Sequence, residues 1–299
     1  MDETERINAE TRQGWSPNFE IQFPPLSRTV AEVTKLLSEP SDSPDTPRLV
    51  EIVNSDPVIG AFVLRRINSA YYGMRTRIAD IQKACFLLGF EEVCDIVLTA
   101  GMMKLGDIFE SASQIKIFEQ IMEMSLGTAG FNKRLAQHLN LSRRGFAFTT
   151  GLLHTVGRLV LLYNRPSDYE ALWYTNKTGT PPPVTSERIV FGTDHAELAA
   201  RAAEDWHLPT DATAVIRNYL TPGHVHDSEV RVPALTLSIS AAATMHFFLD
   251  TDEGDQEFSP PAALYALARQ IRTPSDEIVS FLHQQSSDVG TFIHSMVHT

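Results

Sequence analysis

The sequence is poor in cysteine and in strand-like alternation of polar and apolar residues. Its 299 residues include two cysteines, Cys85 and Cys94, with no CxxC motif and no Cys/His ligand spacing. This pattern excludes a disulfide scaffold and a structural zinc site. Both thiols are expected to be buried and reduced. Because strand-type alternation is scarce along the whole chain, a β-rich fold is disfavoured.

Basic residues and long apolar runs are also in short supply. Lys and Arg number 25 against 37 Asp and Glu, a formal net charge of −12. Such a chain repels polyanions and anionic lipid, so we expect no nucleic-acid partner and no membrane association. The polar start MDETERINAETRQG is unlike a signal peptide. No apolar run approaches the roughly 20 residues that cross a bilayer. We therefore expect a cytoplasmic protein, with VPALTLSISAAATMHFFL as a buried helix.

The common catalytic motifs are missing as well. The sequence has no GxSxG nucleophile motif, no Walker phosphate loop and no GxGxxG dinucleotide fingerprint. Cys85 and Cys94 lie in apolar helical runs and not in the electropositive settings that activate thiols. These absences lower the expectation of an enzyme without excluding one.

Helical periodicity is what the chain has in abundance. Asp56-Pro57 is a helix start, with an N-cap carboxylate before a proline at the first helical position. Asp80 begins another helix, which Gly89 ends. Asp194-His-Ala-Glu197 is a capping-box pattern. Further helices are expected at about 90–104, 113–140, 143–163, 210–220, 230–249, 260–271 and 275–297. The prediction is an all-α protein.

The predicted helices fall into two parts. Residues 1–20 form a polar N-terminal tail, residues 21–111 an N-terminal helical subdomain, and residues 112–299 a second helical subdomain. The division near 108–114 does not have linker composition. We therefore expect the two parts to share an interface.

Six phrases, taken in order, resemble one known family, the HDOD family ("HD-related output domain") of bacterial signalling proteins. The resemblance covers roughly residues 20 to 250. It implies an N-terminal helical bundle packed against a part related to HD phosphohydrolases. The phrases are Phe23-Pro-Pro-Leu-Ser27, Ser55-Asp-Pro57, Asn68-Ser-Ala-Tyr-Tyr-Gly73, Cys85-Phe-Leu-Leu-Gly89, Gly151-Leu-Leu-His154 and Gly192-Thr-Asp-His-Ala-Glu-Leu198.

The resemblance also implies where a metal site would lie, and most of its ligands are replaced. HD phosphohydrolases hold metals with histidines and carboxylates, which activate a water and stabilise phosphoryl charge. The family's His–Asp pair is His154-Thr155 here, and His195 is the other position that keeps a histidine. The remaining positions that match the family's ligands are Met124, Tyr219, Leu220 and Ala241. Two imidazoles without a carboxylate make a weak metal site. We expect no bound metal, no cofactor and no catalytic residue.

Each retained histidine also has a purely structural interpretation. His154 is expected to be a core histidine that donates to a carbonyl, and His195 a first-turn residue beside the Asp194 cap. Arg158 lies one helical turn after His154, so the two could share a cavity with an anion in place of the metal. Arg143 and Arg144 would add positive potential to that anion site. The alternative is that Arg158 pairs with an acidic residue and the arginine pair is solvated.

The sequence leaves three functions open. The leading hypothesis is a non-catalytic signalling protein that binds another signalling protein of unknown identity. No receiver or GGDEF domain fits in the sequence, so we expect the input to come from a partner or a ligand. The alternatives are a divergent metal-dependent phosphohydrolase that uses His154, His195 and Asp194, and a sensor that binds a small nucleotide or phosphate in the vestigial pocket.

Overall fold

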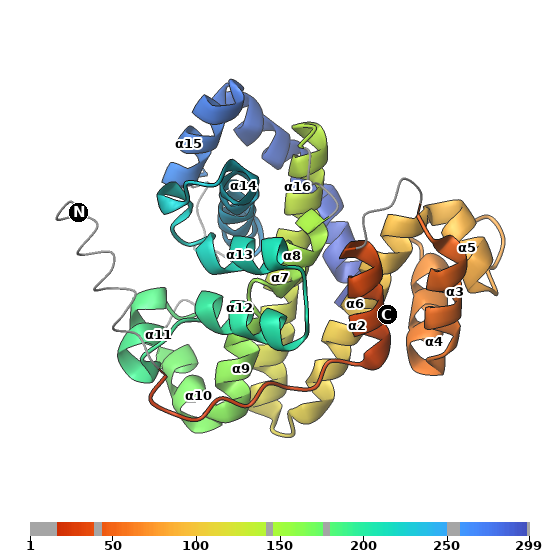
Figure 1. The fold of residues 1–299 in the computed structure, drawn as a ribbon, viewed down its shortest axis with the longest axis horizontal. Coiled ribbons are helices and arrows are strands. Elements are labelled where there is room, and N and C mark those ends of the chain that lie inside the picture. Colours follow the sequence, from red (N-terminus) through yellow and green to blue (C-terminus); the bar gives the residue numbers. More distant parts are fainter. Residues whose placement is uncertain (1–16, 39–43, 142–145, 176–179, 250–257, 298–299) are drawn as a thin grey trace.

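Helices build the fold (Figure 1). The computed structural model describes residues 17–38, 44–141, 146–175, 180–249 and 258–297, and within these ranges no β-strand occurs. The all-α prediction is confirmed.

The N-terminal part is a bundle of short helices that pack on one another. Asp45, Asp56 and Asp80 each accept a backbone N–H at the start of a helix. Gly89, at φ +90°, separates the last two helices in a backbone conformation that favours glycine. The predicted starts at Asp56 and Asp80 are thus confirmed. The helices are α2 (Arg28–Ser38), α3 (Thr46–Asn54), α4 (Pro57–Ile67), α5 (Ile81–Leu88) and α6 (Phe90–Lys104).

The C-terminal part is arranged around one long helix, α7 (Ala112–His138), which follows the 3₁₀ turn Leu105–Ile108. Helix α7 runs through the middle of the molecule and packs on α8, α14 and α16 (Figure 1). The remaining helices are α8 (Ala147–Leu153), α9 (Val156–Asn164), α10 (Pro166–Thr175), α11 (Val184–Phe191), α12 (His195–Asp205), α13 (Thr210–Asn218), α14 (Ser228–Thr244), α15 (Ala262–Ile271) and α16 (Ser275–Val297), with a 3₁₀ turn at Pro222–His224 and a π turn at Met245–Leu249.

The prediction of one helix over 143–163 is wrong. The segment forms two helices that meet at His154 and Thr155. The Arg158 amide donates to the Thr155 carbonyl at 2.8 Å, a tighter turn than the α-helical pattern, and Thr155 lies at φ −95° and ψ −2°. The sequence pattern also gave no indication of α10 and α11, which are short and flank the proline-rich segment 181–183.

An extended N-terminal segment ties the two parts together. Residues 17–27 run along α10 and α9 before the chain enters α2 (Figure 1). The Asn164 side chain bonds both the amide and the carbonyl of Gln22 at 2.8 Å, and Trp206 Nε1 donates to the Pro24 carbonyl at 3.2 Å. Asn18, which the prediction placed in a tail, donates to the Phe191 carbonyl of α11. The Phe-Pro-Pro-Leu phrase is therefore part of an interface.

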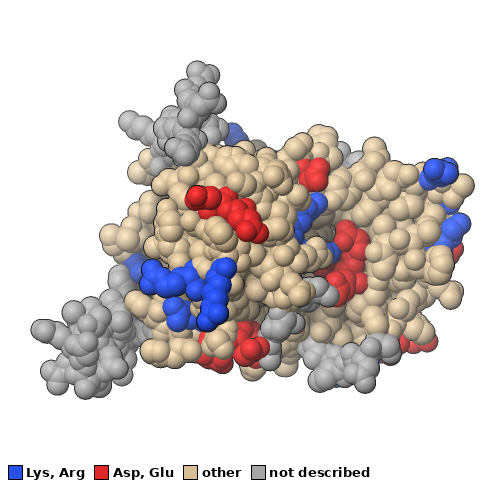
Figure 2. All heavy atoms as spheres, turned by 90° about the horizontal axis from the view of Figure 1, so that it is seen from above, with Lys and Arg blue, Asp and Glu red and all other residues tan. Residues whose placement is uncertain are grey.

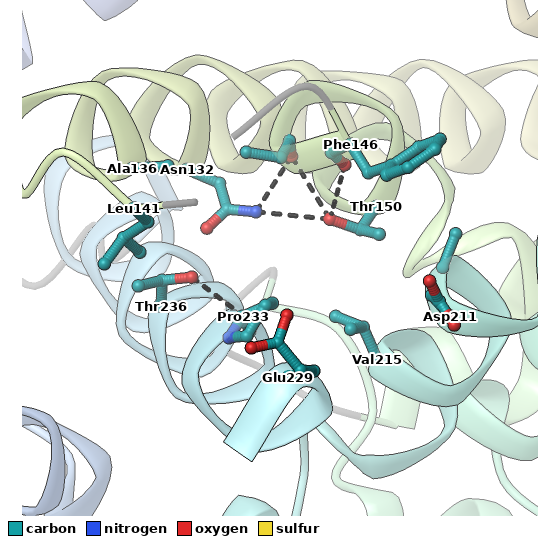
Figure 3. A pocket seen from close by; sticks show the side chains of 12 residues that line it. Asn132, Ala136, Leu141, Phe146, Thr150, Asp211, Val215, Glu229, Pro233 and Thr236 are labelled. Carbon is teal, nitrogen blue, oxygen red and sulfur yellow. Dashed lines mark hydrogen bonds between the residues drawn. The ribbon is translucent and has the colours of Figure 1, made fainter. Parts of the chain in front are cut away.

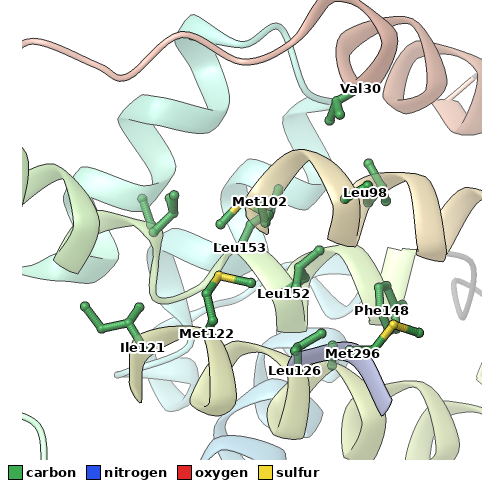
Figure 4. Packing of buried hydrophobic residues seen from close by; sticks show 14 of the residues in the cluster. Val30, Leu98, Met102, Ile121, Met122, Leu126, Phe148, Leu152, Leu153 and Met296 are labelled. Carbon is green, nitrogen blue, oxygen red and sulfur yellow. The ribbon is translucent and has the colours of Figure 1, made fainter. Parts of the chain in front are cut away.

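One hydrophobic core extends through both parts. Met102 of the N-terminal bundle lies close to Leu153 of α8, with Leu126 of α7 nearby, and Val30 of α2 lies against α6 (Figure 4). Each fully buried side chain of this kind stabilises the fold by roughly 1.5–3 kcal/mol. Cys85 and Cys94 are free and buried in the same core, as predicted. The two parts therefore share a packed boundary.

One segment is longer and more apolar than the sequence analysis allowed. Ser228–Leu249 could cross a membrane by length and composition, with a mean hydropathy of 1.5. Half of its most apolar window is buried inside the protein, where α14 packs on α7, α13 and α15. Core helices of water-soluble proteins pass the same test, so this segment is weak evidence for a membrane span.

A glycine permits the close approach of α9 to the start of α12. A Cβ atom at Gly157 would lie 1.9 Å from the His195 carbonyl oxygen. We expect Gly157→Ala to lower the free energy of unfolding by about 1–3 kcal/mol, because backbone must shift to admit the methyl group. Urea denaturation measures the change.

Gly60 in α4 is the matched control, since a Cβ there would meet its nearest neighbour at an ordinary 3.5 Å. Gly60→Ala should be neutral or raise stability by up to about 1 kcal/mol, as expected for a helix interior. Equal stability of the Gly157→Ala variant and the unsubstituted protein would contradict the packing described for α9 and α12.

Candidate functional site

The break between α8 and α9 brings together four of the positions that match the family's metal ligands. His154, Thr155, His195 and Tyr219 are all buried. The Tyr219 ring lies edge-on to His154, with centroids 5.2 Å apart and an interplanar angle of 88°. The His195 ring centroid is 6.0 Å from that of Tyr219. A tyrosine therefore lies between the two remaining histidines.

His195 has both ring nitrogens engaged. Its Nε2 lies 2.5 Å from the Tyr219 hydroxyl, and its Nδ1 lies 2.6 Å from Glu187 Oε2. Burial raises the pKa of Tyr219 well above its ordinary value, so the phenol stays protonated. Its O–H donates a hydrogen bond to His195 Nε2. The Nδ1–H then donates to the Glu187 carboxylate, and the His195 amide donates to the same oxygen at 3.0 Å. Both ring nitrogens of His195 are therefore engaged by neighbouring side chains.

Glu187 also pairs with Arg158. Glu187 Oε1 lies 2.6 Å from Arg158 Nη1, and both side chains are almost wholly buried. Although burial opposes its charge, Arg158 and His195 hold the pKa of Glu187 below its ordinary value. Burial likewise opposes charge on Arg158, yet Glu187 holds the pKa of that guanidinium above its ordinary value. Arg158 Nη1 donates further to the Pro182 carbonyl at 3.1 Å and to the Tyr169 hydroxyl at 3.4 Å.

His154 and Thr155 are tied to the helices that carry them. The His154 Nδ1–H donates to the Gly151 carbonyl at 2.7 Å. Burial lowers the pKa of His154 to about 3, so the imidazole is neutral near pH 7. The Thr155 hydroxyl contacts Ser125 Oγ of α7, and Ser125 donates to the Ile121 carbonyl at 2.9 Å. Thr155, at the position of the family's aspartate, thus links the start of α9 to α7 through a hydrogen bond with Ser125.

The other predicted positions are apolar packing residues. Met124 is buried on α7. Leu220 and Ala241 are partly buried and pack against the apolar cluster around Tyr219. Arg143 and Arg144, predicted to add positive charge to an anion site, lie outside the described residues. Of the proposed anion-binding set, His154 and Arg158 are placed together, with the charge of Arg158 already neutralised by Glu187.

The residues at this site do not fit a metal centre. A metal at His195 would need a free ring nitrogen, yet both are hydrogen-bonded. Asp194, the carboxylate considered for the enzyme alternative, accepts from the Glu197 amide at 3.0 Å and pairs with Arg188 at 2.6 Å. Among the described residues, no three His, Cys, Asp or Glu side chains are grouped so that they could hold a metal ion.

A cavity lies one helical turn from this cluster (Figure 3). Its lining includes Thr150, one turn before His154 on α8, and Val215, one turn before Tyr219 on α13. Asn132 Nδ2 donates to the Ala147 carbonyl at 2.8 Å, and the Thr150 hydroxyl donates to Phe146 at 2.9 Å. Because these donors are already bonded to carbonyls, the cavity presents little that would attract a phosphate.

Glu187 and Tyr169 were not among the predicted site residues. Glu187 lies in α11, which the sequence analysis did not predict, eight residues before His195. The one signal in the sequence was indirect, since a buried Arg158 requires a carboxylate partner. Nothing in the sequence pattern indicated which of the acidic residues would supply it.

A family model of the HDOD domain matches residues 23–222 of this sequence. The chain belongs to the HDOD family. The match covers the whole Tyr219, His195, Glu187 and Arg158 network, and Ala241 lies beyond it.

Solved HDOD-like structures share the fold. An HDOD domain protein of unknown function from Geobacter sulfurreducens is 17% identical, with a TM-score of 0.77 and 99% of each chain covered. A candidate signal transduction protein from Marinobacter aquaeolei VT8 is 18% identical, with a TM-score of 0.70, and the alignment covers 98% of this chain and 65% of that one. A candidate phosphohydrolase from Shewanella amazonensis SB2B is 18% identical, with a TM-score of 0.64, and the alignment covers 96% of this chain and 97% of that one.

One curated relative is much longer than this chain. An uncharacterized protein of Treponema pallidum strain Nichols is 23% identical over 264 residues, which cover 86% of this chain and 49% of that protein. The present chain therefore spans about half the length of that relative.

Removing the carboxylate at the centre of the HDOD site should be costly. We expect Glu187→Gln to lower the free energy of unfolding by about 3–5 kcal/mol, because it leaves the buried Arg158 charge without a counter-ion. Chemical denaturation followed by circular dichroism measures the loss.

The control is an exposed ion pair in the same part of the protein. Glu204, whose side chain is 53% exposed, lies 2.9 Å from Arg217, so Glu204→Gln should change stability by less than about 1 kcal/mol. If the two variants were equally stable, the buried pair would not be the support described above.

Proposed function

We propose that this chain is a non-catalytic regulatory protein of bacterial signal transduction, which acts by binding another protein through its HDOD scaffold. The observation that carries the proposal is the contact of the Tyr219 hydroxyl with His195 Nε2, the nitrogen left for a metal once Nδ1 is bonded to Glu187. A catalytic HD centre needs that nitrogen for a metal, which activates water and neutralises phosphoryl charge.

The phosphohydrolase alternative has less support. The Shewanella structure described as a phosphohydrolase is 18% identical, a likeness that reaches the fold alone. The alternative requires Thr155 to act in place of a carboxylate, and its hydroxyl is engaged with Ser125. Signal transduction is the description given to the Marinobacter structure, which agrees with the regulatory proposal.

The ligand-sensor alternative requires the network to open. A phosphate or nucleotide at His154 and Arg158 would have to displace Glu187 from the guanidinium. Such a ligand would also need an exchange path, because His154 and Arg158 are 3% and 5% exposed. The closed network therefore favours a scaffold that presents outer surfaces to a partner.

Two measurements on the full chain test the proposal. Hydrolysis of bis(p-nitrophenyl) phosphate is followed with Mn²⁺, Mg²⁺ or Fe²⁺ for the protein and for a His154→Gln/His195→Gln variant. Affinity capture from the source bacterium with quantitative mass spectrometry then looks for a partner, with an unrelated helical protein as the bait control.

We expect phosphodiester turnover no greater than that of the double variant, and reproducible recovery of a signalling protein. Metal-dependent turnover that disappears in the double variant would contradict the non-catalytic proposal. Repeated capture of nothing above the control bait would contradict the partner-binding proposal.

A further inference from the structure

A groove between α14 and α15 has chemistry unlike the rest of this acidic protein. It lies away from the HDOD site, along the outer face of α15. Its lining residues are Arg231, Ala262, Tyr265, Ala266, Arg269 and Gln270. None of these six is acidic. The groove therefore combines two cationic side chains with an aromatic ring and a floor of small residues.

The two arginines carry charge that no carboxylate of the described residues neutralises. Arg231 and Arg269 make no ion pair with any described residue, whereas Arg188, Arg201 and Arg217 of the same part each do. The Nε of Arg231 is buried and makes no hydrogen bond. An unsatisfied buried donor costs roughly 1–3 kcal/mol.

The groove follows one continuous face of a helix. Residues 262, 265, 266, 269 and 270 recur at helical spacing on α15, opposite the core-facing Leu264 and Leu267. Ala262 and Ala266 leave room for another backbone, and Tyr265 is 52% exposed beside them. An extended or helical segment could lie along this face with one side chain against the tyrosine.

Local charge decides what kind of segment fits. Seen from above, the molecule shows a group of basic side chains with acidic side chains on two sides of it (Figure 2). Glu229 lies two residues before Arg231, but it lines the cavity of Figure 3 on another face of α14. Two guanidiniums match one or two carboxylates. They are too few to hold a polyanion or an anionic membrane against a formal net charge of −12.

We propose that this groove docks an acidic segment of a partner protein, with Asp or Glu carboxylates bonded to Arg231 and Arg269 and the segment lying on the alanine face of α15. Arginine presents a planar fork of donors that matches a carboxylate. The inference rests on the proposed function, because it names the surface and the partner chemistry that a non-catalytic HDOD scaffold would use.

Fluorescence polarisation on the full chain tests the docking site. The probe is a fluorescein-labelled peptide of alternating Glu and Ala, compared with the same peptide carrying Gln in place of Glu. The variants are Arg269→Gln, whose side chain is exposed, and Arg231→Gln/Arg269→Gln. The matched control is Arg75→Gln/Arg77→Gln, because these arginines are exposed on the N-terminal part.

We expect the Glu peptide to bind more tightly than the Gln peptide and to weaken as salt is added. Binding should fall several-fold in Arg269→Gln, about tenfold or more in the double variant, and not at all in the control pair. No binding, equal binding of the two peptides, or an equal loss in the control pair would overturn the proposal. Full displacement by low-millimolar inorganic phosphate would also overturn it and assign the groove to small anions.

Failure of this test is distinguishable from failure of the proposed function. Affinity capture with the full chain recovers a partner whether or not that partner docks through an acidic segment. A captured partner that binds the Arg231→Gln/Arg269→Gln variant normally would leave the regulatory role standing and move the docking surface elsewhere.

Discussion

The buried ion pair between Arg158 and Glu187 is the interaction on which the rest of the site depends. It fixes the Glu187 carboxylate at a distance of 2.6 Å from the guanidinium. The second oxygen of Glu187 then holds His195, and His195 receives the Tyr219 hydroxyl. A chain of contacts thus runs from α9 through α11 and α12 to α13. The two buried charges neutralise each other, although Arg158 Nε makes no hydrogen bond.

On the proposed function, this network takes the place that a metal holds in an HD-type site. In a metal centre, the ion would draw side chains of several helices to one point. Here the Tyr219 ring lies edge-on to His154 while its hydroxyl bonds His195, so one side chain reaches both histidines. Thr155 adds a contact to Ser125 of α7. The side chains at these positions therefore contact one another within a single buried network.

The sequence was sufficient for the fold class and for part of the site. Helix starts at Asp56 and Asp80 were predictable because capping is local chemistry. The meeting of His154, Thr155, His195 and Tyr219 could be inferred from the family resemblance alone. The break at His154 could not, since an uninterrupted apolar pattern does not reveal a tightened turn. Glu187 was missed because its role depends on tertiary packing that brings it from α11 to Arg158 of α9.

The central claim is that hydrogen bonds among protein side chains occupy the place of the metal. The most direct measurement is anomalous diffraction from crystals soaked in manganese, with the Tyr219 side chain refined independently of the manganese position. The account predicts no anomalous peak between His154 and His195, and a Tyr219 hydroxyl within hydrogen-bonding distance of His195 Nε2. A manganese peak bonded to His195 Nε2, with Tyr219 displaced, would contradict it.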